Sequence, residues 1–506
     1  MRLNRALVKR RPMTLLQLTA MLLAPLLLGA CAVAIPDATP PPPAASAWQA
    51  PLPHEGDPAQ LAQWWQRFDD PTLAQLIELA QRDNPGIAGS LARISQSRAT
   101  ARVAGASRLP SLDANGQLIR SATPEPPSVA ATIAGASLDA LWELDLFGAN
   151  RRTRDAALAR VEAHTAEWHD ARVSLAAEVA STYASLRLCE ALLQVYRQDL
   201  TSQRLVLDLT NRKVRSGFSA PADAALIDAG AAEAANRVRA QLAQCDLLVK
   251  SLVTLTAHPE DALRRLLAGR SGRLPQPGLL TVTQVPAAVL AQRPDLVALE
   301  RELVAAASEV GVAEADRYPG IRLTGSIGYA AFRALGMTGT GATWSFGPTL
   351  SLPLFDAGRR KALVDQSRGR FQELVAAYRQ RAAQAVQEVE EALVRLESAS
   401  DRLKDAERAA QSFQVYLKAA RSRFQTGAGT AFEQEDARRS SLNATAALLQ
   451  VRSERIAAGI SLYKALGGGW EPAAGMPRQG NAQNSPQGSP QVHPGSAQAC
   501  PQPCTR

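Results

Sequence analysis

Residues 347–360, GPTLSLPLFDAGRR, join an alternating apolar run to a tight turn and to the start of a long helical pattern. Residues 137–152, SLDALWELDLFGANRR, repeat that order about 210 residues earlier, a period far longer than that of a solenoid. The same offset relates three further pairs of markers: Asn84-Pro85 with Arg293-Pro294, Leu109-Pro110 with Tyr318-Pro319, and Gly217 with Gly427. The sequence therefore predicts two copies of one unit, each with the order helix, strand, strand, long helix, tight turn and helix.

Four runs of about 9–11 residues alternate between apolar and polar side chains, which suits tilted strands that cross a bilayer around a wet interior. They lie near residues 112–118, 138–146, 321–329 and 344–354, and their aromatic residues fall near run ends, as in a membrane girdle. A soluble antiparallel sheet with one solvated face would alternate identically, but the export signal described below favours a membrane barrel. Because about eight strands are the fewest that close a barrel, several chains would have to build it together.

The proline-free residues 359–424 carry apolar side chains at alternating spacings of three and four, which predicts a coiled-coil helix on the order of 95 Å long. Residues 151–214 are its counterpart in the first unit. Each long helix ends in a glycine-centred reversal, after which Ser or Thr can cap the returning helix. The predicted tip residues are Gly217, Ser219, Gly427 and Thr430.

The first thirty residues have the features of an export signal, because a basic segment precedes the apolar residues 15–28. The run is short for a membrane-spanning helix and contains Gln17 and Pro25. It ends in Leu28-Gly29-Ala30-Cys31, similar to a bacterial lipobox, in which Cys31 would be acylated after cleavage and would anchor the mature chain. The alternative is an ordinary signal peptide with an unrelated cysteine.

Five regions follow from composition and from the repeat. They are a lipoprotein signal peptide (1–30), the acylated Cys with a Pro/Ala-rich tether (31–56), a first repeat (57–270), a second repeat (271–473) and a disordered C-terminal tail (474–506). The five basic residues of the signal carry more than half of the formal net charge of +9. The high isoelectric point is therefore a property of the targeting segment, and we expect no nucleic-acid binding.

The sequence contains no HExxH, P-loop or GxSxG pattern. We expect no enzymatic activity, no metal site, and no cofactor beyond the covalent lipid on Cys31. The glycine-rich residues 336–341 resemble a phosphate-binding loop, but they open no helix and lie between two strand patterns. We predict a flexible loop at the rim of the barrel there.

Cys189 and Cys245 lie about 28 residues before and after Gly217, so an antiparallel hairpin that turns there brings them to nearly the same height. An exported protein enters an oxidising compartment, which favours a disulfide across the first hairpin. The alternative is two buried free thiols.

Over residues 63–470 the chain resembles the TolC-like outer-membrane efflux channels, in their NodT or OprM-like lipoprotein branch. The resemblance is carried by the lipobox, a Trp64-Trp65-x-x-Phe68-Asp69-Asp70-Pro71 opening, both strand-to-helix junctions, Arg293-Pro294-Asp295-Leu296 and both glycine turns. It implies a homotrimer in the outer membrane, lipid-anchored and extending into the periplasm. Three chains of four strands would form a twelve-stranded β-barrel, continuous with a periplasmic coiled-coil α-helical tunnel, in a fold that is otherwise mostly α.

The resemblance also implies partners and a gate. The tips at Gly217 and Gly427 would dock a periplasmic membrane-fusion adaptor, which attaches to an inner-membrane pump of the resistance-nodulation-division type. The family closes its periplasmic end with acidic residues, which match Glu433 and Asp436 here. Glu433 stands where the family usually has Asp, and Arg438 and Arg439 follow closely. A salt-bridged gate and ordinary solvated charges are therefore alternatives to a carboxylate ring.

Together these features predict a passive exit duct for small molecules in a tripartite efflux system. The alternatives are an exit duct for type I protein secretion, which would share the architecture, and a structural lipoprotein that uses its coiled coils as an envelope spacer.

Overall fold

The computed structural model describes residues 34–39, 64–65, 68–122, 130–276 and 292–470, all within one compact unit, Met1–Glu471. The predicted signal peptide, Cys31, most of the tether and the C-terminal tail lie outside the described residues.

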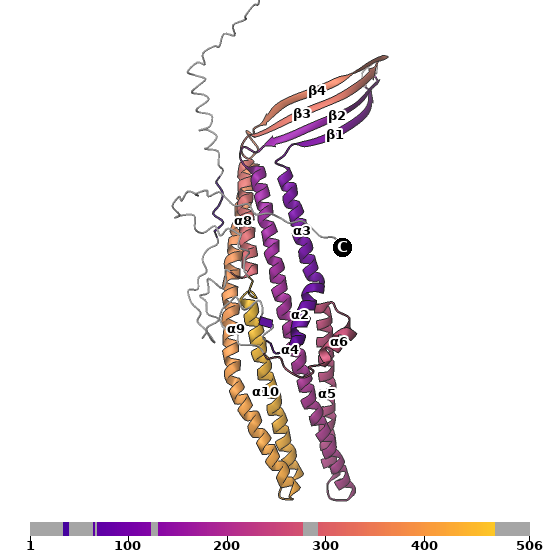
Figure 1. The fold of residues 1–506 in the computed structure, drawn as a ribbon, viewed down its shortest axis with the longest axis vertical. Helices are drawn as coiled ribbons and strands as arrows, with labels where there is room; N and C mark the ends of the chain where they lie inside the picture. The colour runs from indigo at the N-terminus through magenta and orange to yellow at the C-terminus, as the bar shows by residue number, and fades with distance from the viewer. Residues whose placement is uncertain (1–33, 40–63, 66–67, 123–129, 277–291, 471–506) are drawn as a thin grey trace, which may run out of the picture. The chain divides into compact units, whose positions relative to one another are not determined.

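The structure confirms the duplicated order of elements (Figure 1). The first copy contains α3 (Pro85–Ala106), β1 (Ser111–Ala122), β2 (Ala130–Leu144), α4 (Ala149–Arg215) and α5 (Pro221–Thr256), preceded by α2 (Pro71–Asp83) and followed by α6 (Glu260–Ala268). The second copy contains α8 (Pro294–Ala315), β3 (Gly320–Ala334), β4 (Met337–Ser351), α9 (Arg359–Gln425) and α10 (Ala431–Ala465). Both long helices, α4 and α9, have 67 residues, or about 100 Å, as the uninterrupted sequence patterns predicted.

The two strand-to-helix junctions use the same local chemistry. Gly148 and Gly358 adopt positive φ angles of 80° and 85° immediately before the long helices, a conformation that glycine adopts without steric cost. The carboxylate of Asp145 accepts hydrogen bonds from the free backbone N–H groups of Asn150 and Arg151 at 3.0 and 2.7 Å. Asp356 does the same in the second copy for Gly358 and Arg360, both at 3.1 Å. An acidic side chain at a helix start is also favoured by the helix dipole.

The Asn84 and Arg293 markers fasten each copy to the end of its own returning helix. Asn84 donates through Nδ2 to the carbonyl of Leu255 in α5 at 2.8 Å. Arg293 donates through Nη1 to the carbonyl of Ala465 in α10 at 2.9 Å. The offset in the sequence therefore corresponds to an equivalent contact in space.

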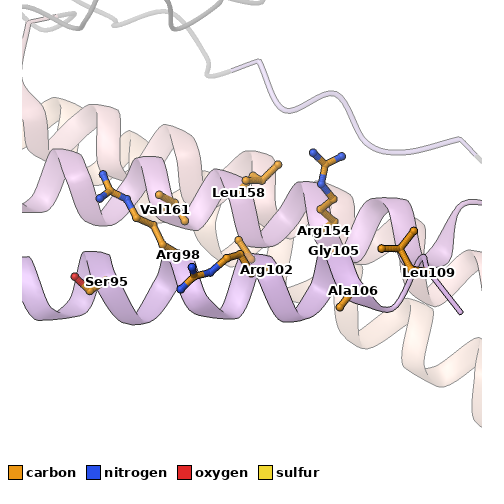
Figure 2. Close-up of a pocket in the computed structure, with 10 residues that line it drawn as sticks. Ser95, Arg98, Arg102, Gly105, Ala106, Leu109, Arg154, Leu158 and Val161 are labelled. Atoms are coloured by element: carbon orange, nitrogen blue, oxygen red, sulfur yellow. The ribbon is translucent and has the colours of Figure 1, made fainter. Parts of the chain in front are cut away.

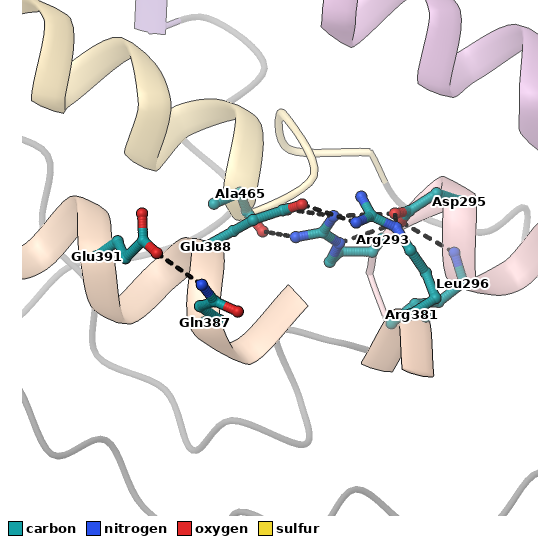
Figure 3. Close-up of polar contacts among 8 residues, drawn as sticks. All are labelled: Arg293, Asp295, Leu296, Arg381, Gln387, Glu388, Glu391 and Ala465. Atoms are coloured by element: carbon teal, nitrogen blue, oxygen red, sulfur yellow. Dashed lines mark hydrogen bonds and ion pairs between the residues drawn. The ribbon is translucent and has the colours of Figure 1, made fainter. Parts of the chain in front are cut away.

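The buried Arg293 is also the centre of a partly buried ion-pair network, which Figure 3 shows. It pairs with Asp295 at 2.9 Å and with Glu388 of α9 at 2.7 Å, and Arg381 pairs with the same two carboxylates at 2.6 and 2.7 Å. Two cations and two anions alternate in this network, so each charge that is removed from water faces opposite charges. The network fixes α8 against α9.

The four strands form one antiparallel sheet in the order β1-β2-β3-β4. They have 12 to 15 residues, longer than the 9–11 predicted. The predicted rim loop at residues 336–341 is wrong, because β4 begins at Met337 and only Leu335 and Gly336, both with positive φ, form the turn. Trp344 consequently lies in the middle of β4, so the expectation that it stands near the end of a strand is wrong.

The two faces of the sheet differ in chemistry. On one face Asp139 accepts hydrogen bonds from Asn115, Ser137 and Ser326 at 2.5–2.9 Å, which joins β1, β2 and β3 through side chains. The other face carries large exposed apolar side chains, including Trp344 and Phe346, whose exposed fractions are 81% and 76%. The helices of the described part include none that is both long and apolar enough to cross a membrane.

The largest core lies where α2, α4, α5, α6, α9 and α10 meet. Trp64 stacks on Tyr463 of α10 with ring centroids 5.2 Å apart, and Tyr183 of α4 donates to the buried Asp70 at 2.7 Å. Burial and this hydrogen bond raise the pKa of Tyr183 to about 12, so its hydroxyl keeps its proton at neutral pH. The segment before α2 thus connects the two copies.

The Arg293 network predicts a pH-dependent contribution to stability. Burial acts to raise the pKa of Asp295, but Arg293 and Arg381 outweigh it and hold that pKa below the ordinary value of 3.8. A carboxyl group whose pKa is lowered by folding stabilises the protein at pH values above its unfolded-state pKa. This stability is lost as the pH falls through the folded-state pKa. We expect Asp295→Asn to lower stability by about 1–3 kcal/mol at pH 7. The loss should be much smaller at a pH below the folded-state pKa of Asp295, which itself lies below 3.8, measured by thermal unfolding at the two pH values.

The matched control is Asp401→Asn, because the pair that Asp401 forms with Lys404 is exposed, and its loss should change stability little at either pH. An equal loss in Asp295→Asn at both pH values would show that the charge of this group is not what stabilises the fold.

Candidate functional site: hairpin tips and the contacts between hairpins

The candidate site is the end of the two hairpins, α4–α5 and α9–α10, that lies away from the sheet (Figure 1). Both tips end their long helix in the same way. Gly217 has a φ of 77°, and Phe218 N donates to the carbonyl of Lys213 at 2.8 Å. Gly427 has a φ of 76°, and Ala428 N donates to the carbonyl of Arg423 at 2.9 Å. This is the glycine-dependent helix ending that the sequence predicted.

The returning helices begin differently. Thr430 accepts a hydrogen bond from Glu433 N, and the Glu433 carboxylate accepts one from Thr430 N, both at 3.1 Å. This is a reciprocal capping box. In the first hairpin Ala220 occupies the cap position, and Ser219 instead donates to the Asp223 carboxylate at 2.8 Å. The expectation that the Ser219 hydroxyl caps α5 is therefore wrong.

Each tip presents a phenylalanine to solvent. Phe218 and Phe432 are 84% and 80% exposed. Basic residues Arg212, Lys213 and Arg215 occupy the last turn of α4 beside Phe218. Exposed aromatic side chains beside arginine are typical of residues that contribute most of the energy in protein interfaces.

The two predicted gate residues have different surroundings. Glu433 is occupied by the capping box and also lies 3.5 Å from Arg423 of the preceding helix. Asp436 is exposed, and within the described part of the chain no hydrogen bond or ion pair engages its carboxylate. Of the two predicted gate residues, it is thus Asp436 whose carboxylate is free to act on its surroundings in the part of the chain that the structure describes.

The arginines after the predicted gate do form ion pairs, but with other carboxylates. Arg438 is buried, pairs with Glu435 one turn earlier, and reaches Asp199 of α4 at 3.0 Å. Burial acts to lower the pKa of Arg438, but hydrogen bonds to Glu435 and Asp199 outweigh it and raise that pKa. Asp199 also accepts from Arg237 of α5 at 2.8 Å. We call these four residues the inter-hairpin lock, because they join both helices of the first hairpin to α10.

Cys189 of α4 and Cys245 of α5 are joined in a disulfide whose Cα atoms are 5.6 Å apart. Both side chains are buried, and Gln241 donates through Nε2 to the carbonyl of Cys189 at 3.2 Å. The first hairpin thus has a covalent cross-link, and in the second hairpin ion pairs such as Arg402–Glu454 connect α9 with α10 at the surface.

A groove of about 780 Å³ lies along the contact between α3 and α4 (Figure 2). It contains Arg98, Arg102 and Arg154, and their guanidinium groups extend to separate points along it (Figure 2). The three groups do not converge on one point, so the groove does not form a site for a single small anion. The described residues also contain no cluster of three or more side chains that could hold a metal ion.

The model of the family described as "Outer membrane efflux protein" matches residues 76–257 and 285–468. The chain is 31% identical to outer membrane protein OprJ of Pseudomonas aeruginosa, over 89% of this chain and 95% of that protein. It is 28% identical to nodulation protein T of Rhizobium leguminosarum bv. viciae, over 90% and 94%. The solved structure of the outer-membrane channel OprN superposes with a TM-score of 0.76 at 28% identity, covering 87% of this chain and all of that one.

The disulfide can be tested by mapping alkylated peptides by mass spectrometry with and without reductant. We expect the peptides that contain Cys189 and Cys245 to be linked and unlabelled in untreated protein, and to carry one label each after reduction. Two labelled, unlinked peptides from untreated, folded protein would overturn the cross-link.

The inter-hairpin lock predicts that Arg438→Met loosens α10 from α4. Removing one partner of a buried ion pair costs about 3–5 kcal/mol because a buried charge is left uncompensated, although Arg237 still faces Asp199 here. We expect amide hydrogens of α10 near Arg438 to exchange at least tenfold faster, measured by hydrogen–deuterium exchange. Arg452→Met is the control, since its pair with Glu407 is about half exposed; equal exchange in both variants would contradict the role of the lock.

Proposed function

The chain belongs to the outer membrane efflux protein family, and from this premise we propose how its parts form an exit duct. It is an outer-membrane channel component of an efflux system. The observation that carries the proposal is the sheet, which has one apolar face, one hydrogen-bonded polar face and two open edges.

We propose that three chains close their sheets into a twelve-stranded barrel. Because neighbouring strands of the sheet are antiparallel, β1 and β4 run in opposite directions, and β1 of one copy can pair with β4 of the next in an antiparallel ladder throughout. The Asp139 face would then line the lumen, and the Trp344 face would contact lipid. Pairing between copies would also satisfy the backbone N–H and C=O groups of both edge strands inside the membrane.

The helices continue this duct towards the periplasm. α3, α4, α8 and α9 follow one another side by side (Figure 1), so three copies would supply twelve helices around a tunnel. The exposed tips at Phe218 and Phe432 would dock the hairpins of a periplasmic adaptor, attached to an inner-membrane pump of the resistance-nodulation-division type. Acylation of Cys31 would anchor the mature N-terminus in the outer membrane.

We place the periplasmic constriction at Asp436, in a three-fold ring that attracts cations. Glu433 would support this ring indirectly, through the cap that orients the first turn of α10. The inter-hairpin lock would hold α10 against α4 in the resting state, and adaptor docking would break the lock and widen the ring. Transport itself is passive, with selectivity set largely by the pump.

Single-channel conductance in planar bilayers tests the proposal. We expect wild-type protein to form small, cation-selective channels, Asp436→Ala to reduce the preference for cations severalfold, and Arg438→Met to increase conductance. Asp228→Ala is the matched control, because Asp228 is an exposed carboxylate at a similar distance from the other tip, and it should behave as wild type.

If Asp436→Ala forms channels with unchanged selectivity, the proposed duct would be supported, but the proposed constriction at Asp436 would be contradicted. An absence of channels from protein shown to be folded and trimeric would overturn the duct and favour a structural spacer.

A further inference from the structure

The apolar face of the sheet is continuous and uncharged over most of its height. Directly paired residues of neighbouring strands share a face, so the register defines rungs across the sheet. The rungs from Ile321 to Ala331 place residues such as Leu138, Ile327 and Trp344 on this face, and no charged residue occurs among them.

The height of this apolar band matches a membrane. Ile321 and Ala331 are ten residues apart on β3, or about 33 Å along the strand. With the tilt of about 40° that is usual in barrels, the band is roughly 25 Å tall, the height of the lipid-facing band of outer-membrane barrels.

The next rung ends the band abruptly. It consists of Arg120, Thr132, Arg333 and Thr338, paired directly across all four strands. Both arginines are exposed, and among the described residues no carboxylate pairs with either. Since β1 and β3 are separated by one strand, the two side chains arise roughly 10 Å apart on the same face.

At the same height the opposite face of the sheet changes from polar to apolar. There Ile119, Ile133 and Phe332 form an apolar rung where the rungs nearer the helices carry Asp139 and Asn115. The two arginines are thus not part of the polar surface that would line the lumen. They continue the apolar face at the end of the sheet remote from the helices, since β1 follows α3 at Ser111 and β3 follows α8 at Gly320.

We propose that Arg120 and Arg333 bind the phosphorylated headgroup of a glycolipid in the outer leaflet, that is, lipopolysaccharide. The inference rests on the proposed membrane-spanning barrel, which places this rung at the outer headgroup level. Arginine pairs with phosphate through two parallel hydrogen bonds, and Thr132 and Thr338 add hydroxyl donors between and beside the two guanidinium groups. The occupant is a lipid because the site is continuous with the apolar face that acyl chains would cover.

Native mass spectrometry of the detergent-purified protein tests the site. The probes are bis-phosphorylated lipid A, the same lipid without its phosphates, phosphatidylglycerol and inorganic phosphate. We expect wild-type protein to retain bis-phosphorylated lipid A in preference to the other three, and Arg120→Ala/Arg333→Ala to bind it at least tenfold more weakly. Arg120→Lys/Arg333→Lys should lie between them, since lysine keeps the charge without the paired geometry.

Arg322→Ala is the matched control, because Arg322 lies on the other face of β3, where it pairs with Glu143 at 3.1 Å; its affinity should equal that of wild type. Equal lipid A affinity in the double alanine variant and wild type would overturn the proposal, as would equally tight binding of phosphatidylglycerol or free phosphate.

Conductance of the same preparations separates this inference from the duct. If channels form but the double alanine variant and wild type bind lipid A equally, only the glycolipid site would be overturned. Folded trimers that form no channels would overturn the membrane placement on which the site depends.

Discussion

A four-stranded sheet with two open edges and an uncharged apolar face is the constraint on which the rest of this structure depends. Each open edge presents unpaired backbone N–H and C=O groups, which are a template for pairing in water and are costly in lipid. The apolar face adds large exposed side chains such as Trp344. Both demands are met together if identical sheets pair edge to edge, and an even number of strands per chain keeps that pairing antiparallel.

The two duplicated junctions connect strands of this sheet directly to the long helices. A carboxylate, Asp145 or Asp356, and a left-handed glycine let each strand turn directly into a 67-residue helix without leaving the first backbone N–H groups unsatisfied. The two copies differ where each is fastened to the end of its returning helix. Asn84 makes one hydrogen bond to α5, whereas Arg293 makes the equivalent bond to α10 and also belongs to an ion-pair network. The position of the contact is kept, although its chemistry is not.

Elements whose ends are determined by nearby residues, such as glycine turns, could be predicted from the sequence. Both long helices end within two residues of the predicted bounds, because glycine turns and the absence of proline determine them locally. The start of β4 was missed because residues 337–343 are mostly glycine and threonine, whose pairing with β3 carries no apolar signal. The capping role of Glu433 was visible in the T-x-x-E spacing after Gly427. The inter-hairpin lock was not, because Asp199 and Arg438 are far apart in sequence and only the packing of α10 on α4 brings them together.

The two hairpins have the same outline but unequal internal restraints, and this inequality bears on which one can move. The first is cross-linked by the Cys189–Cys245 disulfide, which limits separation of α4 from α5. In the second, Arg402–Glu454 and Arg452–Glu407 connect α9 with α10 at the surface, where ion pairs contribute about 0–1 kcal/mol each. The buried contact of Arg438 with Asp199 instead ties α10 to the first hairpin. Loss of that contact would therefore release the less restrained hairpin, the one that carries Asp436, while the cross-linked hairpin keeps its shape.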